Sequence, residues 1–469
     1  MTLIKSISGI RGTIGGKPGD ALTPVDIVKF ASAYGTWLMQ QNNSKPYSVV
    51  IGRDARISGS MLSGLVCNTL SGLGIDVIDV GFSTTPTVEM AVTFMKASGG
   101  IILTASHNPK QWNALKLLNE KGEFLSAANG AEILAIAERG EFTFSDVNHL
   151  GKITVDNTAF AKHFEAILAL PLVDRKAIEK ANFRIVIDCV NSTGGIAVPA
   201  LLKILGVKDV IELYCEPNGQ FPHNPEPLPE NLTEISKEVV KKKAHLGIVV
   251  DPDVDRLALV CEDGEMFGEE YTLVAVADYI LKNKPGNTVS NLSSTRALRD
   301  VTEKHGGAYY ASAVGEVNVV EMMKEKNAII GGEGNGGIIY PQLHNGRDAL
   351  VGIALFLSHL AKYGKSCSML RSSYPDYFIS KNKIELTTDM DVDEIISEIE
   401  QKYKKQPMNT IDGVKIEFDK EWVHLRKSNT EPIIRIYSES TSMTTAENLA
   451  EKIIMDIKDI VSRMMTVKN

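Results

Sequence analysis

The polar stretch at residues 104–109 is the part of the sequence most suited to chemistry. It reads Thr-Ala-Ser-His-Asn-Pro and follows an apolar run at residues 101–103, which is typical of a short buried strand. Pro109 lacks an amide hydrogen and cannot extend strand pairing. Ser106 is therefore expected in a loop at a strand end, where α/β proteins usually place reactive groups. From these residues alone, Ser106 could be a nucleophile, a carrier of phosphate or an ordinary turn residue.

Two side chains near Ser106 in the sequence could transfer protons. His107 is its neighbour, and Lys116 follows ten residues later. A lysine beside a metal ion and other cations could have a lowered pKa and act as a base. Each could also have an ordinary role, Lys116 as a surface charge and His107 as a hydrogen-bonding loop residue. The choice of general base stays open between them.

Three aspartates alternate in the segment Asp-Pro-Asp-Val-Asp-Arg at residues 251–256, directly after the apolar run 246–250. Alternate side chains of an extended backbone point the same way, so the carboxylates are expected to converge. Converging carboxylates repel unless a cation joins them, and ligation by oxygen alone suits Mg²⁺. An exposed acidic turn is one alternative. A calcium loop is set aside, because Arg256 stands where that loop needs glycine. We expect one Mg²⁺ bound by Asp251, Asp253 and Asp255.

Three further segments carry polar side chains that suit an anionic sugar. The glycine-rich opening, residues 6–16, presents Arg11 either to an anion or as part of a flexible entry turn. The glycine-rich loop 331–337 lacks the Lys-Ser/Thr of a P-loop, and its long polar side chains, Glu333 and Asn335, suit sugar hydroxyls. A mobile linker is the alternative for that loop. A set of donors near the C-terminus suits a phosphate dianion, with a solvated basic turn as the alternative: Arg426, Ser428, Asn429, Thr430 and Arg435.

A strand–loop–helix–strand pattern recurs along the chain and must position these residues. Its three copies begin with strands at residues 49–51, 184–187 and 288–290. Each copy has a further strand that ends in one of the first three polar loops, near Ser106, the aspartates or Glu333. This pattern predicts three related α/β domains with mixed, largely parallel sheets. If they share a fold, the three loops occupy equivalent strand ends and can face one central cleft.

The pattern changes beyond about residue 370, where an acidic amphipathic helix, antiparallel strands and a long closing helix indicate a smaller α+β domain. We therefore expect four domains. Each holds one of the polar sites: residues 1–153 hold Ser106, 154–262 the aspartates, 263–370 the sugar-type loop and 371–469 the phosphate-type loop.

Composition limits the possible partners. The chain has 469 residues, 43% of them hydrophobic, and a formal net charge of −8, which argues against a nucleic-acid or membrane-surface binder. Its five cysteines are scattered without a Cys-x-x-Cys pair, as is typical of a reducing compartment. The N-terminus lacks a signal-peptide core, and no apolar run could span a membrane. We expect a cytoplasmic protein, monomer or homodimer, with no nucleic-acid or membrane partner.

Together the motifs resemble the α-D-phosphohexomutases, the superfamily of phosphoglucosamine, phosphomannose and phosphoglucose mutases. That family has a Ser-His-Asn-Pro phosphoserine loop, an Asp-x-Asp-x-Asp-Arg metal loop, a Gly-Glu sugar loop and an Arg-x-Ser-Asn-Thr-x-Pro phosphate loop, and all four occur here in order. The resemblance implies four domains around a cleft, with phosphorylated Ser106 beside Mg²⁺. It also implies that Glu333 reads sugar hydroxyls and that the loop 426–430 holds the distal phosphate. The implied active-site cations are Arg11, Lys116 and Arg256.

One motif departs from the family. Bacterial members commonly have Glu-x-Ser-Gly-His in the sugar loop, whereas Asn335 and Gly337 stand here at the serine and histidine positions, as in archaeal-type members. The resemblance implies a mutase that moves phosphate between O6 and O1 of a hexose through a hexose 1,6-bisphosphate. Glucosamine 6-phosphate is the expected substrate, because bacteria that build peptidoglycan need that step.

Three alternatives to this function remain. Mannose or glucose phosphate is the alternative substrate. A non-catalytic sugar-phosphate-binding protein should have lost Ser106 or the aspartates. A phosphatase would release the phosphoserine to water, which closure of the fourth domain should prevent.

Overall fold

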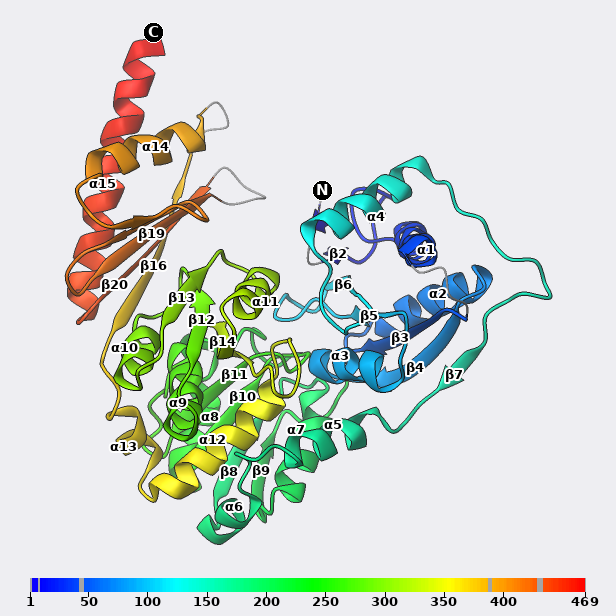
Figure 1. The fold of residues 1–469 in the computed structure, drawn as a ribbon, viewed down its shortest axis with the longest axis horizontal. Helices are drawn as coiled ribbons and strands as arrows, with labels where there is room; N and C mark the ends of the chain where they lie inside the picture. Colours follow the sequence, from blue (N-terminus) through cyan, green and yellow to red (C-terminus); the bar gives the residue numbers. More distant parts are fainter. Residues whose placement is uncertain (1, 7–8, 42–45, 387–389, 428–432, 469) are drawn as a thin grey trace.

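The computed structural model describes residues 2–6, 9–41, 46–386, 390–427 and 433–468, and it contains four sheets (Figure 1). We call the parts built on these sheets the first to fourth domains, in chain order. The second and third domains pack together, with the first domain at one side and the fourth standing at the other. The predicted class, three related α/β domains and a smaller α+β domain, is confirmed.

The first domain has a seven-stranded mixed sheet in the order β1-β2-β6-β5-β3-β4-β7. The centre of β3, residues 49–52, and the whole of β5 are apolar and buried because helices cover both faces of the sheet. Val49 and Ile51 face one core with α1, α2 and α4, whereas Val50 faces another with α3. The strands are β1 (Ile4–Ser6), β2 (Gly9–Thr13), β3 (Ser48–Arg53), β4 (Asp76–Phe82), β5 (Gly99–Leu103), β6 (Trp112–Leu118) and β7 (Ile153–Val155). The helices are α1 (Pro24–Gln41), α2 (Gly59–Gly72), α3 (Thr85–Phe94) and α4 (Ala127–Arg139).

The flexible entry turn considered for residues 6–16 is wrong for residues 9–13. They form β2, which pairs antiparallel with β6 and sets Arg11 opposite Ala114. Gly9 has φ +122°, and a Cβ there would lie 2.3 Å from the Leu115 carbonyl oxygen. Glycine is therefore needed for close strand contact at this point, where the composition had suggested flexibility.

The second and third domains repeat the central strand order of the first. In each, two strands flank a central parallel strand, and a fourth strand returns as an antiparallel hairpin at the edge: β11-β10-β8-β9 and β15-β14-β12-β13 match β6-β5-β3-β4. The strands are β8 (Arg184–Asp188), β9 (Asp209–Leu213), β10 (Leu246–Val250), β11 (Leu257–Cys261), β12 (Asn287–Asn291), β13 (Tyr309–Ser312), β14 (Ala328–Glu333) and β15 (Gly337–Ile339). The three loops predicted to be equivalent thus follow β5, β10 and β14.

Helices surround these two sheets, and the long apolar helices α9 and α12 lie between them in one continuous core. Asp348 begins α12 by accepting hydrogen bonds from the Leu350 and Val351 amides, as an N-cap residue should. The helices are α5 (Ala159–Leu168), α6 (Arg175–Ala181), α7 (Gly194–Ile204), η1 (Pro229–Asn231), α8 (Thr233–Lys241), α9 (Glu269–Asn283), α10 (Ala297–Lys304), α11 (Glu316–Glu325), α12 (Ala349–Tyr363) and α13 (Cys367–Arg371).

The fourth domain is an antiparallel sheet, β16-β20-β19-β18-β17, packed against α14 and α15. It meets the third domain through polar contacts, including Arg299 to Glu417 at 2.8 Å and Lys415 Nζ to the Leu292 carbonyl at 2.8 Å. Its elements are β16 (Phe378–Glu385), α14 (Val392–Tyr403), β17 (Met408–Asn409), β18 (Val414–Glu417), β19 (Trp422–Lys427), β20 (Ile433–Ser440) and α15 (Met443–Lys468). Within the described ranges, no helix has the length and apolar character needed to cross a membrane.

Candidate active site

Ser106 lies in a tight loop directly after β5, as predicted. Its backbone is left-handed, with φ 48°, a conformation that serine rarely adopts outside tight turns. The loop is closed by the Ser106 amide, which donates to Thr104 Oγ1 at 2.9 Å. The hydroxyl donates across the domain boundary to Asp251 Oδ2 at 2.8 Å. Ser106 is thus held against the acidic loop of the second domain.

Arg56 holds the Ser106 loop in place, and the sequence analysis gave it no role. Its buried guanidinium donates to four backbone carbonyls of the loop and of the β6 entry: Ser106, Asn108, Pro109 and Trp112. Its Nε pairs with Asp54 Oδ2 at 3.0 Å. A signal was present, because Asp54 and Arg56 follow β3, the parallel neighbour of β5, and such strand ends lie side by side.

The three aspartates converge as predicted, but by a different geometry. One oxygen from each of Asp251, Asp253 and Asp255 lies within 4.8 Å of the others. The segment is a turn between β10 and β11, with Val254 at φ 62°, and not an extended strand. Asp251 Oδ1 closes the turn by accepting from the Asp255 and Arg256 amides, both at 3.1 Å. The alternation argument therefore named the right residues for the wrong structural reason.

The triad fits a divalent cation on the evidence of its own atoms. Asp253 Oδ1 and Asp255 Oδ1 are buried and have no hydrogen-bond partner among the described residues, and such buried acceptors are costly. Burial, together with repulsion from Asp255 and Asp253, raises the pKa of Asp251 well above its ordinary value. A hard cation would satisfy both the free oxygens and the repulsion, and oxygen ligands of this kind suit Mg²⁺.

Lys116 reaches the triad from β6. Its Nζ lies 2.7 Å from Asp253 Oδ2 and 3.8 Å from Asp255 Oδ2. Burial alone would lower the pKa of Lys116, but the Asp253 and Asp255 carboxylates outweigh burial and raise the pKa to about 12. The expected lowering, which depends on a metal ion and other cations beside Lys116, stays a prediction. The charges that contact Lys116 here are the carboxylates of Asp253 and Asp255.

His107 has the opposite electrostatic environment. Its Nδ1 lies 3.4 Å from Ser106 Oγ. Burial, followed by the positive charges of Arg256 and Arg347, lowers the pKa of His107 to about 2. The imidazole is therefore neutral and next to the serine hydroxyl, in a position from which it can share a hydrogen bond with that hydroxyl.

The sugar-type loop is a tight hairpin and not a mobile linker. Glu333 ends β14 and pairs with Gly337 of β15. Its Oε1 accepts from Asn291 Nδ2 at 2.8 Å, and its Oε2 accepts from Arg347 Nη1 at 2.7 Å. Asn335 Oδ1 accepts from the Gly337 amide at 3.2 Å and so helps to close the turn.

Arg347 is a second cation that the sequence analysis missed. It is buried and spans three carboxylates, with distances of 2.6 Å to Asp255, 2.7 Å to Glu333 and 3.1 Å to Glu316. A Cβ at Gly337 would lie only 2.3 Å from Arg347 Cδ. Gly337 stands where histidine is usual, and because it has no side chain, Arg347 can occupy the space beside it. A cation is therefore present next to the sugar-type loop.

Several of these residues line one cleft of about 780 Å³, a volume that suits a small ligand. Its walls come from the first three domains and include Arg11, Lys116, Ser106, His107, Arg256, Glu333 and Arg347. Burial, with a smaller effect of Arg435, lowers the pKa of Arg11. Arg256 Nη1 lies 3.3 Å from Glu226.

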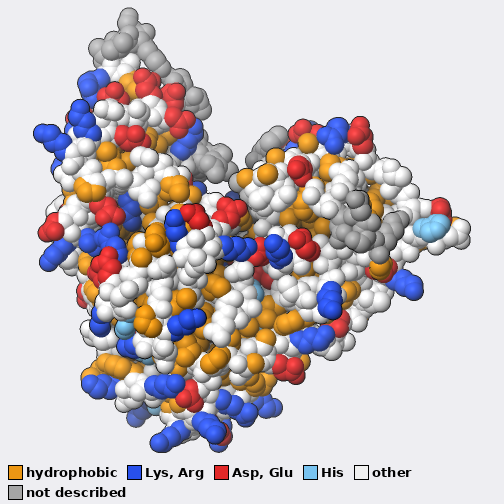
Figure 2. All heavy atoms as spheres, viewed as in Figure 1, with side chains coloured by type: hydrophobic (Ala, Val, Ile, Leu, Met, Phe, Trp, Pro, Cys, Tyr) orange, Lys and Arg blue, Asp and Glu red, His pale blue; other side chains and the backbone are white. Residues whose placement is uncertain are grey.

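The predicted phosphate site of the fourth domain lies outside this cleft lining. Arg426 pairs with Asp412 at 2.8 Å, and Arg426 and Arg435 are opposite each other in the β19–β20 ladder. The predicted residues Ser428, Asn429 and Thr430 lie outside the described residues. In the space-filling view, a notch separates the fourth domain from the first (Figure 2). In this structure Arg426 and Arg435 therefore do not line the cleft that contains Ser106.

The chain is similar to known proteins along nearly its whole length. Four family models match in order: phosphoglucomutase/phosphomannomutase α/β/α domains I, II and III at residues 3–144, 160–264 and 268–377, and the C-terminal domain at 383–455. A phosphoglucomutase/phosphomannomutase of Thermococcus kodakarensis is 35% identical over 94% of this chain and 96% of its own. A phosphoglucosamine/phosphogalactosamine mutase of Sulfurisphaera tokodaii is 30% identical, over 97% and 98%.

Solved structures agree on the fold. A phosphoglucomutase/phosphomannomutase family protein from Burkholderia thailandensis matches with a TM-score of 0.84 at 24% identity, covering 97% of this chain and 98% of the other. The four matched domains, the relatives and the order of the loops lead to one conclusion: the chain belongs to the phosphoglucomutase/phosphomannomutase family and is a phosphohexomutase, an isomerase.

Proposed function

We propose that this phosphohexomutase converts glucosamine 6-phosphate into glucosamine 1-phosphate through phosphorylated Ser106. The observation that carries the proposal is the hydroxyl of Ser106, held 2.8 Å from Asp251 at the edge of a cleft lined by cations. The name of the S. tokodaii relative supports an amino sugar. The name of the T. kodakarensis relative supports mannose or glucose phosphate, which is the alternative substrate.

The reaction has two balanced transfers. In the first, the C1 hydroxyl of the 6-phosphate attacks the phosphorus on Ser106. The P–Oγ bond breaks, a base takes the hydroxyl proton, and a 1,6-bisphosphate forms. In the second transfer, Ser106 Oγ attacks the phosphate at O6. The P–O6 bond breaks, and O6 takes the proton, so the phosphoserine is restored with release of the 1-phosphate.

Mg²⁺ would be held by Asp251, Asp253, Asp255 and an oxygen of phosphorylated Ser106. When bound, it supplies positive charge that stabilises the transferring phosphoryl group. Arg11, Lys116 and Arg256 add further positive charge on the cleft wall, and transfer of this kind depends on positioning and charge. Glu333 and Asn335 would receive the sugar hydroxyls.

The general base is either Lys116 or His107. His107 lies next to the Ser106 hydroxyl, and Lys116 contacts the carboxylates of Asp253 and Asp255. Lys116→Met and His107→Gln variants should separate the two roles in single-turnover reactions of the phosphorylated enzyme. Loss of the base should slow phosphoryl transfer by about 10²–10⁴-fold and change the pH–rate profile. Loss of a group that only positions the serine should leave the shape of that profile unchanged.

We also propose that the fourth domain closes over the substrate. The arginines Arg426 and Arg435, with the adjoining loop 428–430, would then hold the phosphate that is not being transferred. The bisphosphate must exchange its ends, so this cradle should recognise phosphate and not the sugar, which suits arginine side chains. Polar contacts between the third and fourth domains support a hinge, because such interfaces commonly permit domain motion.

The substrate is tested by a coupled assay with the 6-phosphates of glucosamine, mannose and glucose under Mg²⁺. We expect the highest kcat/KM for glucosamine 6-phosphate. A higher value for mannose or glucose 6-phosphate would replace the proposed substrate, and turnover of none of them would remove the proposed reaction. The cytoplasmic location, the monomeric or homodimeric state and the domain bounds at 153, 262 and 370 stay predictions from the sequence.

A further inference from the structure

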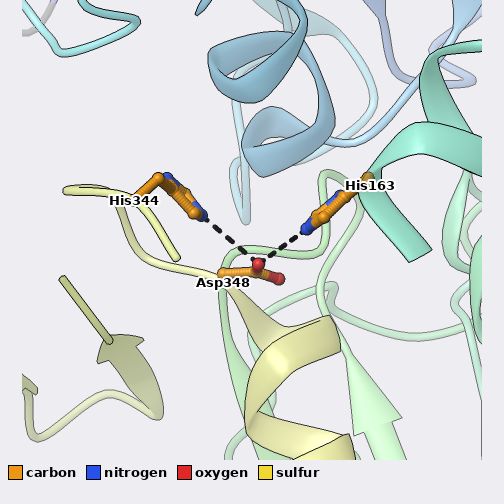
Figure 3. Close-up of side chains that lie close together, drawn as sticks. All are labelled: His163, His344 and Asp348. Atoms are coloured by element: carbon orange, nitrogen blue, oxygen red, sulfur yellow. Dashed lines mark hydrogen bonds and ion pairs between the residues drawn. The ribbon is translucent and has the colours of Figure 1, made fainter. Parts of the chain in front are cut away.

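A second cluster of metal-ligating side chains lies apart from the aspartate triad, at the start of α12 (Figure 3). Asp348 Oδ1 is used by the helix cap, where it accepts from the Leu350 amide at 2.8 Å. Its other oxygen, Oδ2, faces two imidazoles, with His163 Nε2 at 2.9 Å and His344 Nε2 at 3.3 Å. The two rings approach this one oxygen from different sides.

The spacing of the three atoms suits a small metal ion. All three lie within 4.8 Å of one another. Ligands about 2.0–2.1 Å from a tetrahedral ion are separated from each other by roughly 3.3 Å, close to the two distances from Asp348 Oδ2. His163 and Asp348 have fully buried side chains, and that of His344 is 13% exposed. The rings are nearly perpendicular, at 89°, so they do not stack on each other.

The outer nitrogen of each ring also has a partner. His163 Nδ1 lies 2.9 Å from Thr87 Oγ1, and His344 Nδ1 lies 3.3 Å from Glu89 Oε2. Metal-bound histidines almost always have such a partner on the outer nitrogen, which fixes the tautomer and the ring orientation. Glu89 is only 2% exposed, and its carboxylate is directed at the ring that would bind the ion.

We propose that His163, His344 and Asp348 form a second metal site that binds one divalent transition-metal ion such as Zn²⁺. Two imidazoles and one carboxylate favour Zn²⁺ over Mg²⁺, which prefers oxygen ligands. The ligands come from α5 and from the segment before α12, and their outer partners Thr87 and Glu89 come from α3. A bound ion would therefore connect the first domain with the helices of the next two.

The position of Asp348 gives this site a connection to the cleft. Arg347, its neighbour, points the other way and contacts Asp255 and Glu333. An ion bound by Asp348 would restrain the backbone from which Arg347 extends. The carboxylates of Asp348 and Glu89 both face the His344 ring and favour a positive charge beside it. Hydrogen bonds among the same side chains, without any ion, are the competing explanation.

The test measures Zn²⁺ and Co²⁺ binding to the full chain after removal of metal, in saturating Mg²⁺ to fill the triad. Equilibrium dialysis should give one tightly bound Zn²⁺ per chain, and Co²⁺ should produce the visible bands of a low-symmetry nitrogen–oxygen site. Both signals should persist in Asp253→Asn, which weakens only the triad. His163→Gln and His344→Gln should each weaken Zn²⁺ binding by more than about tenfold, and Glu89→Gln by about 10–100-fold.

His359→Gln is the matched control. His359 is also buried, lies on α12 and faces a carboxylate, Asp278, at 3.6 Å, but it belongs to no cluster of three ligand atoms in the described residues. The Zn²⁺ affinity of the His359→Gln variant should equal that of the wild type. The proposal is overturned if the wild type binds no Zn²⁺ beyond the triad, or if His163→Gln and His359→Gln bind it equally. If a histidine variant does not fold, the comparison of Glu89→Gln with His359→Gln decides the question in the same way.

Discussion

Substitutions at Gly337 and Arg347 test whether a side chain at position 337 and the side chain of Arg347 would occupy the same space beside the sugar-type loop. A Cβ at position 337 would lie 2.3 Å from Arg347 Cδ, so histidine at 337 and the present Arg347 exclude each other. We consider Gly337→His, Arg347→Ala and the double variant. Histidine at 337 should be harmful alone and tolerated once the arginine side chain is removed.

The magnitudes follow from the contacts of Arg347. It is buried between Asp255, Glu316 and Glu333, and removing one partner of a buried ion pair costs about 3–5 kcal/mol of unfolding free energy. Overpacking by Gly337→His costs about 1–3 kcal/mol. In the double variant, the histidine ring can fill the space that the arginine side chain leaves. This variant should therefore recover most of the unfolding free energy lost through overpacking. The coupling should therefore be about 1–3 kcal/mol in the favourable direction.

Differential scanning calorimetry of the four proteins measures this coupling, and kcat/KM under Mg²⁺ gives a second readout. Arg347→Lys is the control for charge, since lysine keeps the charge but cannot bridge three carboxylates with a planar fork. Additivity of the two substitutions within about 0.5 kcal/mol would refute the shared-space argument. So would a Gly337→His variant with unchanged stability and activity.

Three further predictions concern the proposed mechanism. Ser106→Ala should abolish turnover while the fold is kept, and intact-mass analysis should find one phosphate on the wild type and none on this variant; normal turnover would exclude the phosphoserine. Asp253→Asn should weaken Mg²⁺ binding and reduce kcat far more than it raises KM, and full activity of the wild type after exhaustive chelation would contradict a metal role. Arg426→Ala should weaken binding of the 1-phosphate and 6-phosphate alike, by about 10–100-fold, as expected for a charged hydrogen bond. Arg184→Ala is the control: it removes an exposed arginine that pairs with Asp209, and it should leave binding of both phosphates unchanged. A loss of binding confined to one of the two substrates in Arg426→Ala would show that Arg426 serves another purpose.

Residues whose chemistry is local in sequence could be predicted, whereas residues that act across elements could not. Ser106 and the aspartates stand in short motifs at strand ends. Ser106 lines the cleft, and its hydroxyl donates to Asp251. Arg56 and Arg347 were missed because their partners lie far along the chain, for example 50 residues away at Ser106 and 92 residues away at Asp255. Neither has a motif of its own.

Some expectations from the sequence differ from the structure in cause, in direction or by omission. The aspartates converge because a turn at Val254 folds them together, which alternation along a strand does not describe. The pKa of Lys116 moves upward because two carboxylates are closer to it than any cation. Strand β16 was overlooked, since lysines and an asparagine interrupt its apolar alternation and its partner β20 lies more than 50 residues later. Pairing with a distant strand stabilises β16, and a short window of sequence carries no signal for that pairing.

The hydrogen bonds from Arg56 to the Ser106 loop have a consequence for the stability of the proposed phosphoserine. Each of the four carbonyl oxygens that Arg56 binds carries partial negative charge, and all belong to the short segment from Ser106 to Trp112. If Ser106 carries the phosphate, as proposed, unneutralised oxygens beside it would oppose the modification. Arg56 would then let the loop tolerate phosphorylation of its own serine, so that the resting enzyme keeps the phosphoryl group between rounds of catalysis.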